Sequence, residues 1–234
     1  MDAEPASISV GAGRRVSGLA MRAPDTRACF VFAHGAGAGM SHPFMDSFAS
    51  GLCERGIASL RFQFPYMEAG LKRPDPSNLA QAAIRAAVAE ARLLFPDLCL
   101  LAGGKSFGGR MTSQAAAAAP MPGLRGIAFL GFPLHPPGRP SVDRAEHLRN
   151  VRLPMLFLQG TRDRLADIAL MAEVVRQLGG RATLRLLEGA DHSFHAPARN
   201  APGAAEIKRE MLDAFGAWVE AATVRAPDEG GKRR

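Results

Sequence analysis

The sequence is poor in several residue types on which other protein classes depend. It has three cysteines, one tryptophan and one tyrosine in 234 residues. Cys29, Cys53 and Cys99 are odd in number, far apart and flanked by apolar residues, so we expect small buried side chains rather than a disulfide framework or a metal site. No uncharged apolar run approaches the roughly 18 residues that a membrane helix needs. A disulfide-rich scaffold and a membrane protein are therefore disfavoured.

Lysine is also scarce, although positive charge is in excess. Lysine and arginine total 29 against 22 acidic residues, which gives a net charge of +7. Such an excess can indicate nucleic-acid or membrane binding. Here most of the basic residues are arginines that stand singly or in pairs, and the chain has no group of aromatic residues on which bases could stack. We therefore expect neither a nucleic-acid partner nor a membrane partner.

Length and composition favour one globular domain. Hydrophobic residues make up 47% of the chain and charged residues 22%, which excludes a disordered protein. Because α/β domains of about 200 to 250 residues commonly form single units, we expect one domain over residues 1–224 and a polar tail over 225–234. The acidic N-terminus lacks the apolar stretch of a signal peptide, so we expect a cytoplasmic location. The oligomeric state is left open.

Short apolar runs alternate with segments of helical spacing along most of the chain. Runs without internal alternation are typical of strands covered on both faces, and they lie at 28–33, 57–62, 98–102, 126–131, 155–158 and 183–187. The segments between them predict helices, one of which begins near a capping box formed by Asn78 and Gln81. Weak alternation over 7–21 predicts a hairpin at a sheet edge. This order predicts an α/β fold with a mostly parallel, doubly wound sheet, whose ligands bind at the carboxyl ends of the strands.

The strongest chemical signal is a G-x-S-x-G motif at the end of the third run. Gly104, Ser106 and Gly108 directly follow the strand predicted over 98–102 and precede a stretch of small residues. A serine on a sharp strand-to-helix turn needs small neighbours, because strand and helix approach each other closely there. Its hydroxyl is then exposed at the positive end of a helix. Ser106 is therefore the candidate nucleophile.

Two other interpretations of the same residues are weaker. Gly-Lys-Ser also ends a phosphate-binding loop, but that motif requires glycine six positions before Lys105, where Cys99 stands. Alternatively, Ser106 could be no more than a helix cap. That interpretation does not explain why the complete G-x-S-x-G motif lies between a strand and a helix, as a nucleophile turn requires.

A glycine-rich loop follows the first apolar run, at residues 34–39. Neither register of its glycines satisfies the G-x-G-x-x-G pattern of dinucleotide-binding proteins. The loop is suited to presenting backbone N–H groups, so the amides of Ala36 and Phe107 are the candidate oxyanion hole for a tetrahedral intermediate. We interpret His34 as an anchor of this loop rather than as a catalytic group.

An acid and a base follow the last two runs. Asp163 comes after the run at 155–158 and His192 after the run at 183–187, which completes the chain order Ser, Asp, His used by α/β-hydrolases. Asp167, which we place a turn inside the following helix, and Asp191 are competing acids. We assign Asp191 and His195 to loop hydrogen bonding or to substrate contact.

The motifs resemble those of a known family. The chain is similar to α/β-hydrolases of the dienelactone-hydrolase-like kind, and more narrowly to the predicted hydrolases grouped with the testis-expressed hydrolase-like proteins and a subunit of the nonspecific lethal complex. The resemblance rests on six segments that cover nearly the whole chain beyond the hairpin: 34–37, 61–67, 104–109, 132–138, 159–163 and 191–194. It implies an α/β-hydrolase fold. Dienelactone hydrolases proper have a cysteine nucleophile, where this sequence has Ser106.

These observations predict a serine hydrolase that cleaves an ester or related acyl bond through Ser106, Asp163 and His192, without a cofactor or metal. The short, proline-rich segment at 132–149 leaves no room for a large cap domain, so we expect an open site and a small-molecule acyl substrate. The alternative is a catalytically weak or inactive interaction module on the same fold. The candidate substrate contacts are Lys105, Arg110, Tyr66 and His195. Four basic residues lie near the nucleophile and the acid in sequence: Lys105, Arg110, Arg162 and Arg164. They either favour an anionic substrate or are solvated or ion-paired.

Overall fold

The computed structural model describes residues 2–196 and 203–224. Eight strands form one sheet in the order β1-β2-β4-β3-β5-β6-β7-β8. The strands are β1 (Glu4–Gly11), β2 (Arg14–Met21), β3 (Ala28–Ala33), β4 (Ile57–Phe62), β5 (Cys99–Lys105), β6 (Leu124–Leu130), β7 (Met155–Gly160) and β8 (Ala182–Leu187). Strands β3 to β8 are parallel, whereas β1 and β2 form an antiparallel hairpin at one edge. The predicted sheet and its edge hairpin are confirmed.

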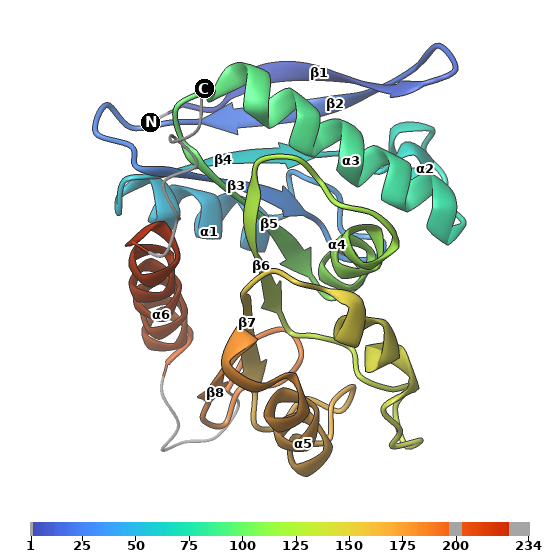
Figure 1. The fold of residues 1–234 in the computed structure, drawn as a ribbon, viewed down its shortest axis with the longest axis vertical. Helices are drawn as coiled ribbons and strands as arrows, with labels where there is room; N and C mark the ends of the chain where they lie inside the picture. The colour runs from blue at the N-terminus through green and yellow to red at the C-terminus, as the bar shows by residue number, and fades with distance from the viewer. Residues whose placement is uncertain (1, 197–202, 225–234) are drawn as a thin grey trace, which may run out of the picture.

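Helices cover both faces of the sheet (Figure 1). They are α1 (Pro43–Cys53), α2 (Pro65–Glu68), α3 (Ser77–Leu94), α4 (Phe107–Ala118), α5 (Ile168–Leu178) and α6 (Ala204–Val224), with the 3-10 helices η1 (Asp143–Asn150) and η2 (Gly179–Arg181). One hydrophobic core lies between the sheet and α3, α4, α5 and η1, and another between the sheet and α1 and α6. Strands β3, β4 and β7 are buried along their whole length, which explains why their sequences do not alternate.

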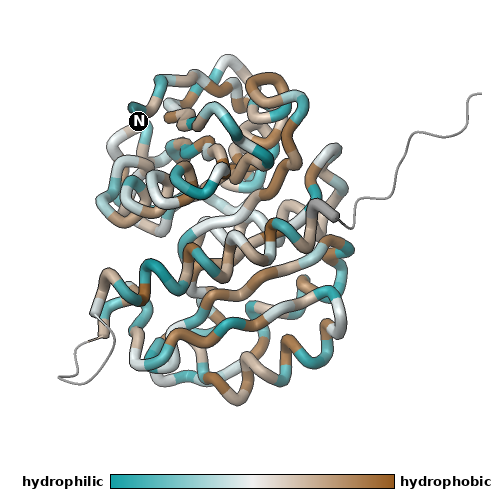
Figure 2. The backbone as a smooth tube through the Cα atoms, turned by 90° about the vertical axis from the view of Figure 1, so that its left-hand side faces the viewer, coloured by the Kyte–Doolittle hydropathy of each residue, from teal (hydrophilic) through white to brown (hydrophobic). Residues whose placement is uncertain are grey.

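The helices differ from the strands in hydropathy. Along the helices of Figure 2 the colour changes between hydrophobic and hydrophilic from residue to residue. In α3, for example, the buried side chains Ala80, Ala83, Ile84, Ala87 and Ala91 recur at helical spacing. Each helix therefore contributes one apolar stripe to a core.

Two local predictions are corrected. Helix α3 begins at Ser77 after Pro76, with no side-chain cap, so Asn78 is already helical and does not form the predicted capping box with Gln81. Proline accounts for this start, because its fixed φ angle is compatible with a helix entrance. The second correction concerns Cys99, which is partly exposed, whereas Cys29 and Cys53 are buried as predicted. The predicted tail at 225–234 lies outside the described residues.

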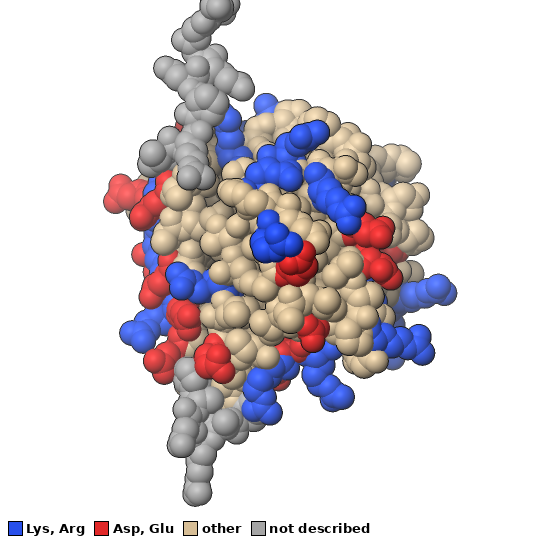
Figure 3. All heavy atoms as spheres, turned by 60° about the horizontal axis from the view of Figure 1, so that its bottom comes forward, with Lys and Arg blue, Asp and Glu red and all other residues tan. Residues whose placement is uncertain are grey.

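The surface carries both signs of charge. On the face shown in Figure 3, basic and acidic side chains are scattered among a larger area of uncharged residues. No helix within 2–196 and 203–224 is both long and apolar enough to span a membrane. In the same residues, no three histidine, cysteine or acidic side chains gather in an arrangement that could hold a metal ion.

Candidate active site

Ser106 occupies the turn between β5 and α4. Its φ of 49° and ψ of −110° lie in a region that non-glycine residues rarely adopt, so this turn stores backbone strain. A Cβ atom at Gly104 or Gly108 would collide with the carbonyl oxygen of Ala33 in β3. The small residues of the motif are therefore needed mainly because the neighbouring strand end approaches this turn so closely.

Ser106, His192 and Asp163 form a continuous chain of hydrogen bonds. The Ser106 Oγ lies 2.8 Å from His192 Nε2, and His192 Nδ1 lies 2.6 Å from Asp163 Oδ2. The carboxylate can only accept, so Nδ1 carries the hydrogen and Nε2 is left to accept the Ser106 proton. The Asp163 side chain is fully buried and that of His192 is 24% exposed. The structure thus brings together the three residues that the sequence placed after separate strands.

Asp163 is held on both oxygens. Its Oδ2 also accepts from the side-chain amide of Gln159 at 2.5 Å, and its Oδ1 accepts from the backbone N–H of Leu165 at 2.7 Å. The other end of the Gln159 amide accepts from the backbone N–H of Phe132 at 2.9 Å. Gln159 is fully buried. The sequence motifs did not predict this role of Gln159, although a glutamine inside an otherwise apolar strand indicates a buried hydrogen-bonding group.

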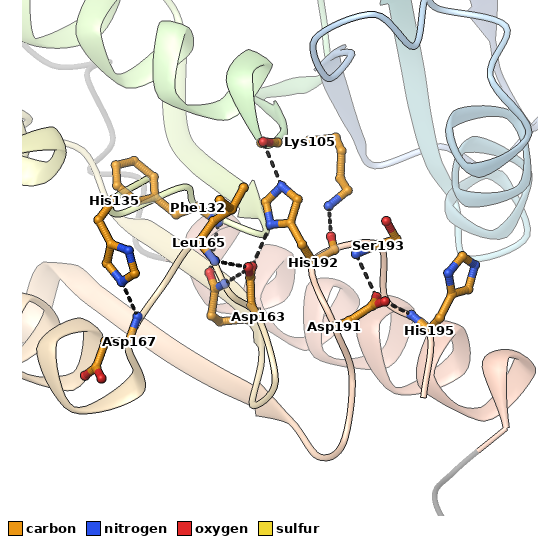
Figure 4. Close-up of polar contacts among 12 residues, drawn as sticks. Lys105, Phe132, His135, Asp163, Leu165, Asp167, Asp191, His192, Ser193 and His195 are labelled. Atoms are coloured by element: carbon orange, nitrogen blue, oxygen red, sulfur yellow. Dashed lines mark hydrogen bonds and ion pairs between the residues drawn. The ribbon is translucent and has the colours of Figure 1, made fainter. Parts of the chain in front are cut away.

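Lys105 reaches from β5 to the loop that carries His192. Its ammonium donates to the backbone carbonyl of His192 (Figure 4). The ammonium also lies 4.5 Å from the ring centre of Phe194 and 5.8 Å from that of Phe44. Burial lowers the pKa of Lys105 to about 8, which the charges of Asp163 and Asp191 partly oppose. The side chain thus ties the residue before Ser106 to the base.

The glycine-rich loop lies on the other side of the nucleophile. His34 is fully buried, its Nε2 accepts from the backbone N–H of Phe64 at 3.1 Å, and its Nδ1 lies 2.7 Å from the Gly35 carbonyl oxygen. Burial lowers the pKa of His34 to about 4, so the ring stays neutral, which fits the predicted anchor. Among the described residues, no acceptor contacts the backbone N–H of Ala36 or of Phe107. Ala36 is exposed.

The competing acids have other partners. Asp191 Oδ1 accepts from the backbone N–H groups of Ser193 and His195 at 2.8 and 2.9 Å, which closes the loop after His192. Asp167 is the N-cap of α5, where it accepts from the Leu170 N–H at 3.0 Å. Its predicted place a turn inside the helix is therefore wrong. Asp167 is separate from the hydrogen-bond chain that contains Asp163 (Figure 4).

The predicted substrate contacts are spread around the site. Tyr66 is buried, and its hydroxyl accepts from the Gly37 N–H at 2.9 Å. His195 is exposed on the loop after His192, and Arg162 and Arg164 are exposed on the loop that carries Asp163. Arg110 is half-buried on α4 near Arg144. Burial, and then the charge of Arg144, lower the pKa of Arg110.

A second serine–histidine pair lies further along α4. Ser113 Oγ is 2.7 Å from His147 Nε2 and donates to the Arg110 carbonyl at 3.0 Å. Burial, and then the charge of Arg110, lower the pKa of His147 to about 4. In the described part of the chain no carboxylate contacts His147. No sequence motif predicted this pair.

Comparisons with known proteins agree with the fold described above. A family model described as an alpha/beta hydrolase domain matches residues 26–220. A dienelactone hydrolase from Anabaena variabilis superposes with a TM-score of 0.76 at 20% identity, over 94% of this chain and 97% of that chain. An α/β serine hydrolase without lid from Xanthomonas campestris gives 0.70 at 20% identity, over 93% and 95%.

The esterase domain of a Rhodothermus marinus protein is similarly related, with a TM-score of 0.71 at 19% identity over 94% of this chain and 99% of that chain. At such identities the three structures show a shared fold. The family model itself spans most of the sequence. The chain therefore belongs to the alpha/beta hydrolase domain family.

Proposed function

We propose that the protein is a serine hydrolase that cleaves an ester or related acyl bond. The observation that carries this proposal is the hydrogen-bond chain from the strained Ser106 turn through His192 to the buried Asp163, with distances of 2.8 and 2.6 Å. A hydroxyl in contact with an imidazole that a carboxylate orients is the usual arrangement of an activated nucleophile.

In this mechanism His192 takes the Ser106 proton as Oγ bonds to the acyl carbonyl carbon. The amides of Ala36 and Phe107 hold the resulting oxyanion, and such donors commonly contribute about 3 kcal/mol each in the transition state. His192 then gives its proton to the leaving oxygen as the ester C–O bond breaks. Water, deprotonated by His192, then attacks the acyl carbon. The bond between this carbon and Ser106 Oγ breaks, His192 returns its proton to Oγ, and the acid is released.

Small carboxylic esters are the substrates that we propose. Between β6 and β7 the chain contains the short η1 as its only helix, so a large cap over Ser106 is lacking there. Arg110 and His195 remain the proposed substrate contacts, whereas the described contacts of Lys105 and Tyr66 are with the protein itself. We also propose a cytoplasmic location. The sequence segments that carry the family resemblance are the basis on which we propose membership of the branch with the testis-expressed hydrolase-like proteins.

Labelling with a fluorophosphonate probe tests the nucleophile directly. The probe should modify wild-type protein and a Ser113→Ala variant, and it should fail to modify Ser106→Ala. Ser113→Ala is the matched control, because that serine also contacts a histidine. Absence of labelling in folded wild-type protein would favour the alternative, a catalytically weak or inactive interaction module.

A further inference from the structure

The segment 61–66, which begins with the last two residues of β4, contacts the glycine-rich loop and the adjoining Met40 at several points. The Arg61 guanidinium donates to the Met40 carbonyl at 3.3 Å and pairs with Asp46 of α1 at 3.0 Å. The side-chain oxygen of Gln63 accepts from the Met40 N–H at 2.8 Å. Together with the bond from the Phe64 N–H to His34, these contacts fix both ends of the loop.

Tyr66 holds the middle of the same loop. Its hydroxyl accepts from the Gly37 N–H at 2.9 Å, one residue after Ala36. The Tyr66 backbone N–H donates in turn to Asp75 at 3.0 Å, and its ring packs 6.4 Å from that of Phe64. The Tyr66 side chain is therefore fixed at its base, at its ring and at its hydroxyl.

The burial of Tyr66 separates this role from substrate contact. Its exposed fraction is only 1%, whereas Ala36 and Gly37 are exposed. Tyr66 therefore lies beneath the loop and supports it from the protein side. Freeing the Gly37 N–H would release the peptide that follows Ala36, and with it the direction of the Ala36 amide. A donor that is not held in place stabilises a developing charge less well.

We propose that Tyr66 is a positioning residue that acts through the loop, by fixing the Ala36 amide against the oxyanion, and that Gln63 assists it. This inference rests on the proposed serine hydrolase function. A positioning role for Tyr66 and the predicted role as a substrate contact lead to different effects on kcat and KM. Loss of a positioning residue lowers kcat alike for all acyl groups and leaves KM unchanged, whereas loss of a substrate contact changes KM in a way that depends on the acyl group.

The test is Tyr66→Phe, which keeps the ring and removes the hydroxyl. We expect kcat to fall about tenfold, the usual size for one hydrogen bond, by the same factor for p-nitrophenyl acetate, butyrate and hexanoate, with KM unchanged. Amide hydrogen exchange at Gly37 should become faster. An unchanged kcat, or a change confined to KM that varies with chain length, would overturn the inference.

A second pair of variants keeps the test decisive if Tyr66→Phe does not fold. Gln63→Glu retains an oxygen acceptor for the Met40 N–H, whereas Gln63→Met has a similar length and no such acceptor. We expect Gln63→Met to lose kcat several-fold and Gln63→Glu to lose less, with KM unchanged in both variants. Equal rates in the two variants would contradict the inference. Wild-type protein without labelling or hydrolysis would refute the proposed function itself, whereas an active wild type matched by its variants refutes only the role of the loop contacts.

Discussion

Two serine–histidine pairs lie along α4, and their surroundings differ. Ser106 at the start of the helix contacts His192 at 2.8 Å, and Ser113 inside the helix contacts His147 at 2.7 Å. By distance alone the two pairs are equivalent. Ser106 sits on a strained turn, whereas Ser113 is part of a regular helix and gives its hydrogen to the Arg110 carbonyl.

The groups around each histidine differ more than the serines do. Asp163 accepts from the far nitrogen of His192 at 2.6 Å and stabilises the positive charge that forms when the ring takes a proton. Burial, and then the positive charge of the nearby Arg110, lower the pKa of the His147 ring to about 4. A carboxylate thus lies behind the histidine of the first pair, whereas burial and a neighbouring cation disfavour a charge on the histidine of the second. A short serine–histidine distance is therefore insufficient to identify a nucleophile.

The largest expected difference between the two pairs is in turnover. Ser106→Ala should lower kcat about a million-fold, as loss of the nucleophile does in a comparable triad, because no other group can form the acyl-enzyme. Ser113→Ala should leave kcat close to wild type, since that hydroxyl bonds only within the protein. Initial rates of p-nitrophenyl acetate hydrolysis measure both. A comparable loss in the two variants would remove the distinction between the pairs.

The next largest effect concerns the carboxylate behind His192. Asp163→Asn should lower kcat about 10⁴-fold, because an amide neither fixes the Nδ1–H tautomer of His192 nor balances its charge. Asp167→Asn is the matched control, since asparagine also serves as an N-cap for α5 and the site is untouched. The kcat of each variant with the same ester checks this. If Asp163→Asn kept most of the wild-type rate, the carboxylate would not distinguish the two pairs.

Much of the fold could be predicted from the sequence, because burial on both faces leaves a direct trace in it. The apolar runs at 28–33 and 57–62 coincide with β3 and β4. The start of α3 could not be placed, because Asn78 and Gln81 match a capping pattern while Pro76 sets the actual helix entrance. Local patterns compete at helix ends, and the sequence does not show which of them prevails.

The candidate site was predictable to the extent that chain order determines position. Ser106, Asp163 and His192 each follow a different parallel strand, and the carboxyl ends of such strands meet at one edge of the sheet. The supporting contacts were not predictable in this way. Two of them join a side chain to a backbone group far away in sequence: Lys105 to the His192 carbonyl, and Tyr66 to the Gly37 N–H. Such pairs depend on the directions of side chains in three dimensions, which the sequence does not show.

The smallest expected effect is on stability, and it concerns His147. Burial, then Arg110, lower its pKa from 6.5 to about 4, so below about pH 6.5 the unfolded chain binds a proton that the folded protein takes up only near pH 4. The contribution of His147 to the free energy of unfolding is therefore fully present above about pH 6.5 and is lost as the pH falls toward 4. His147→Gln removes the titration and should flatten the dependence of unfolding free energy on pH.

The flattening should amount to about 1 kcal/mol between pH 6.5 and pH 5, because one proton contributes at most about 1.4 kcal/mol per pH unit and the partly exposed ring is screened by solvent. Urea unfolding at the two pH values measures it, with the wild type as reference. His34, whose pKa is also lowered to about 4, contributes equally to both proteins and so cancels in the difference.

The His147→Gln variant should keep the wild-type kcat, because His147 is separate from Ser106. A loss of activity without a change in the pH dependence of unfolding would assign the second pair to catalysis and contradict the contrast between them.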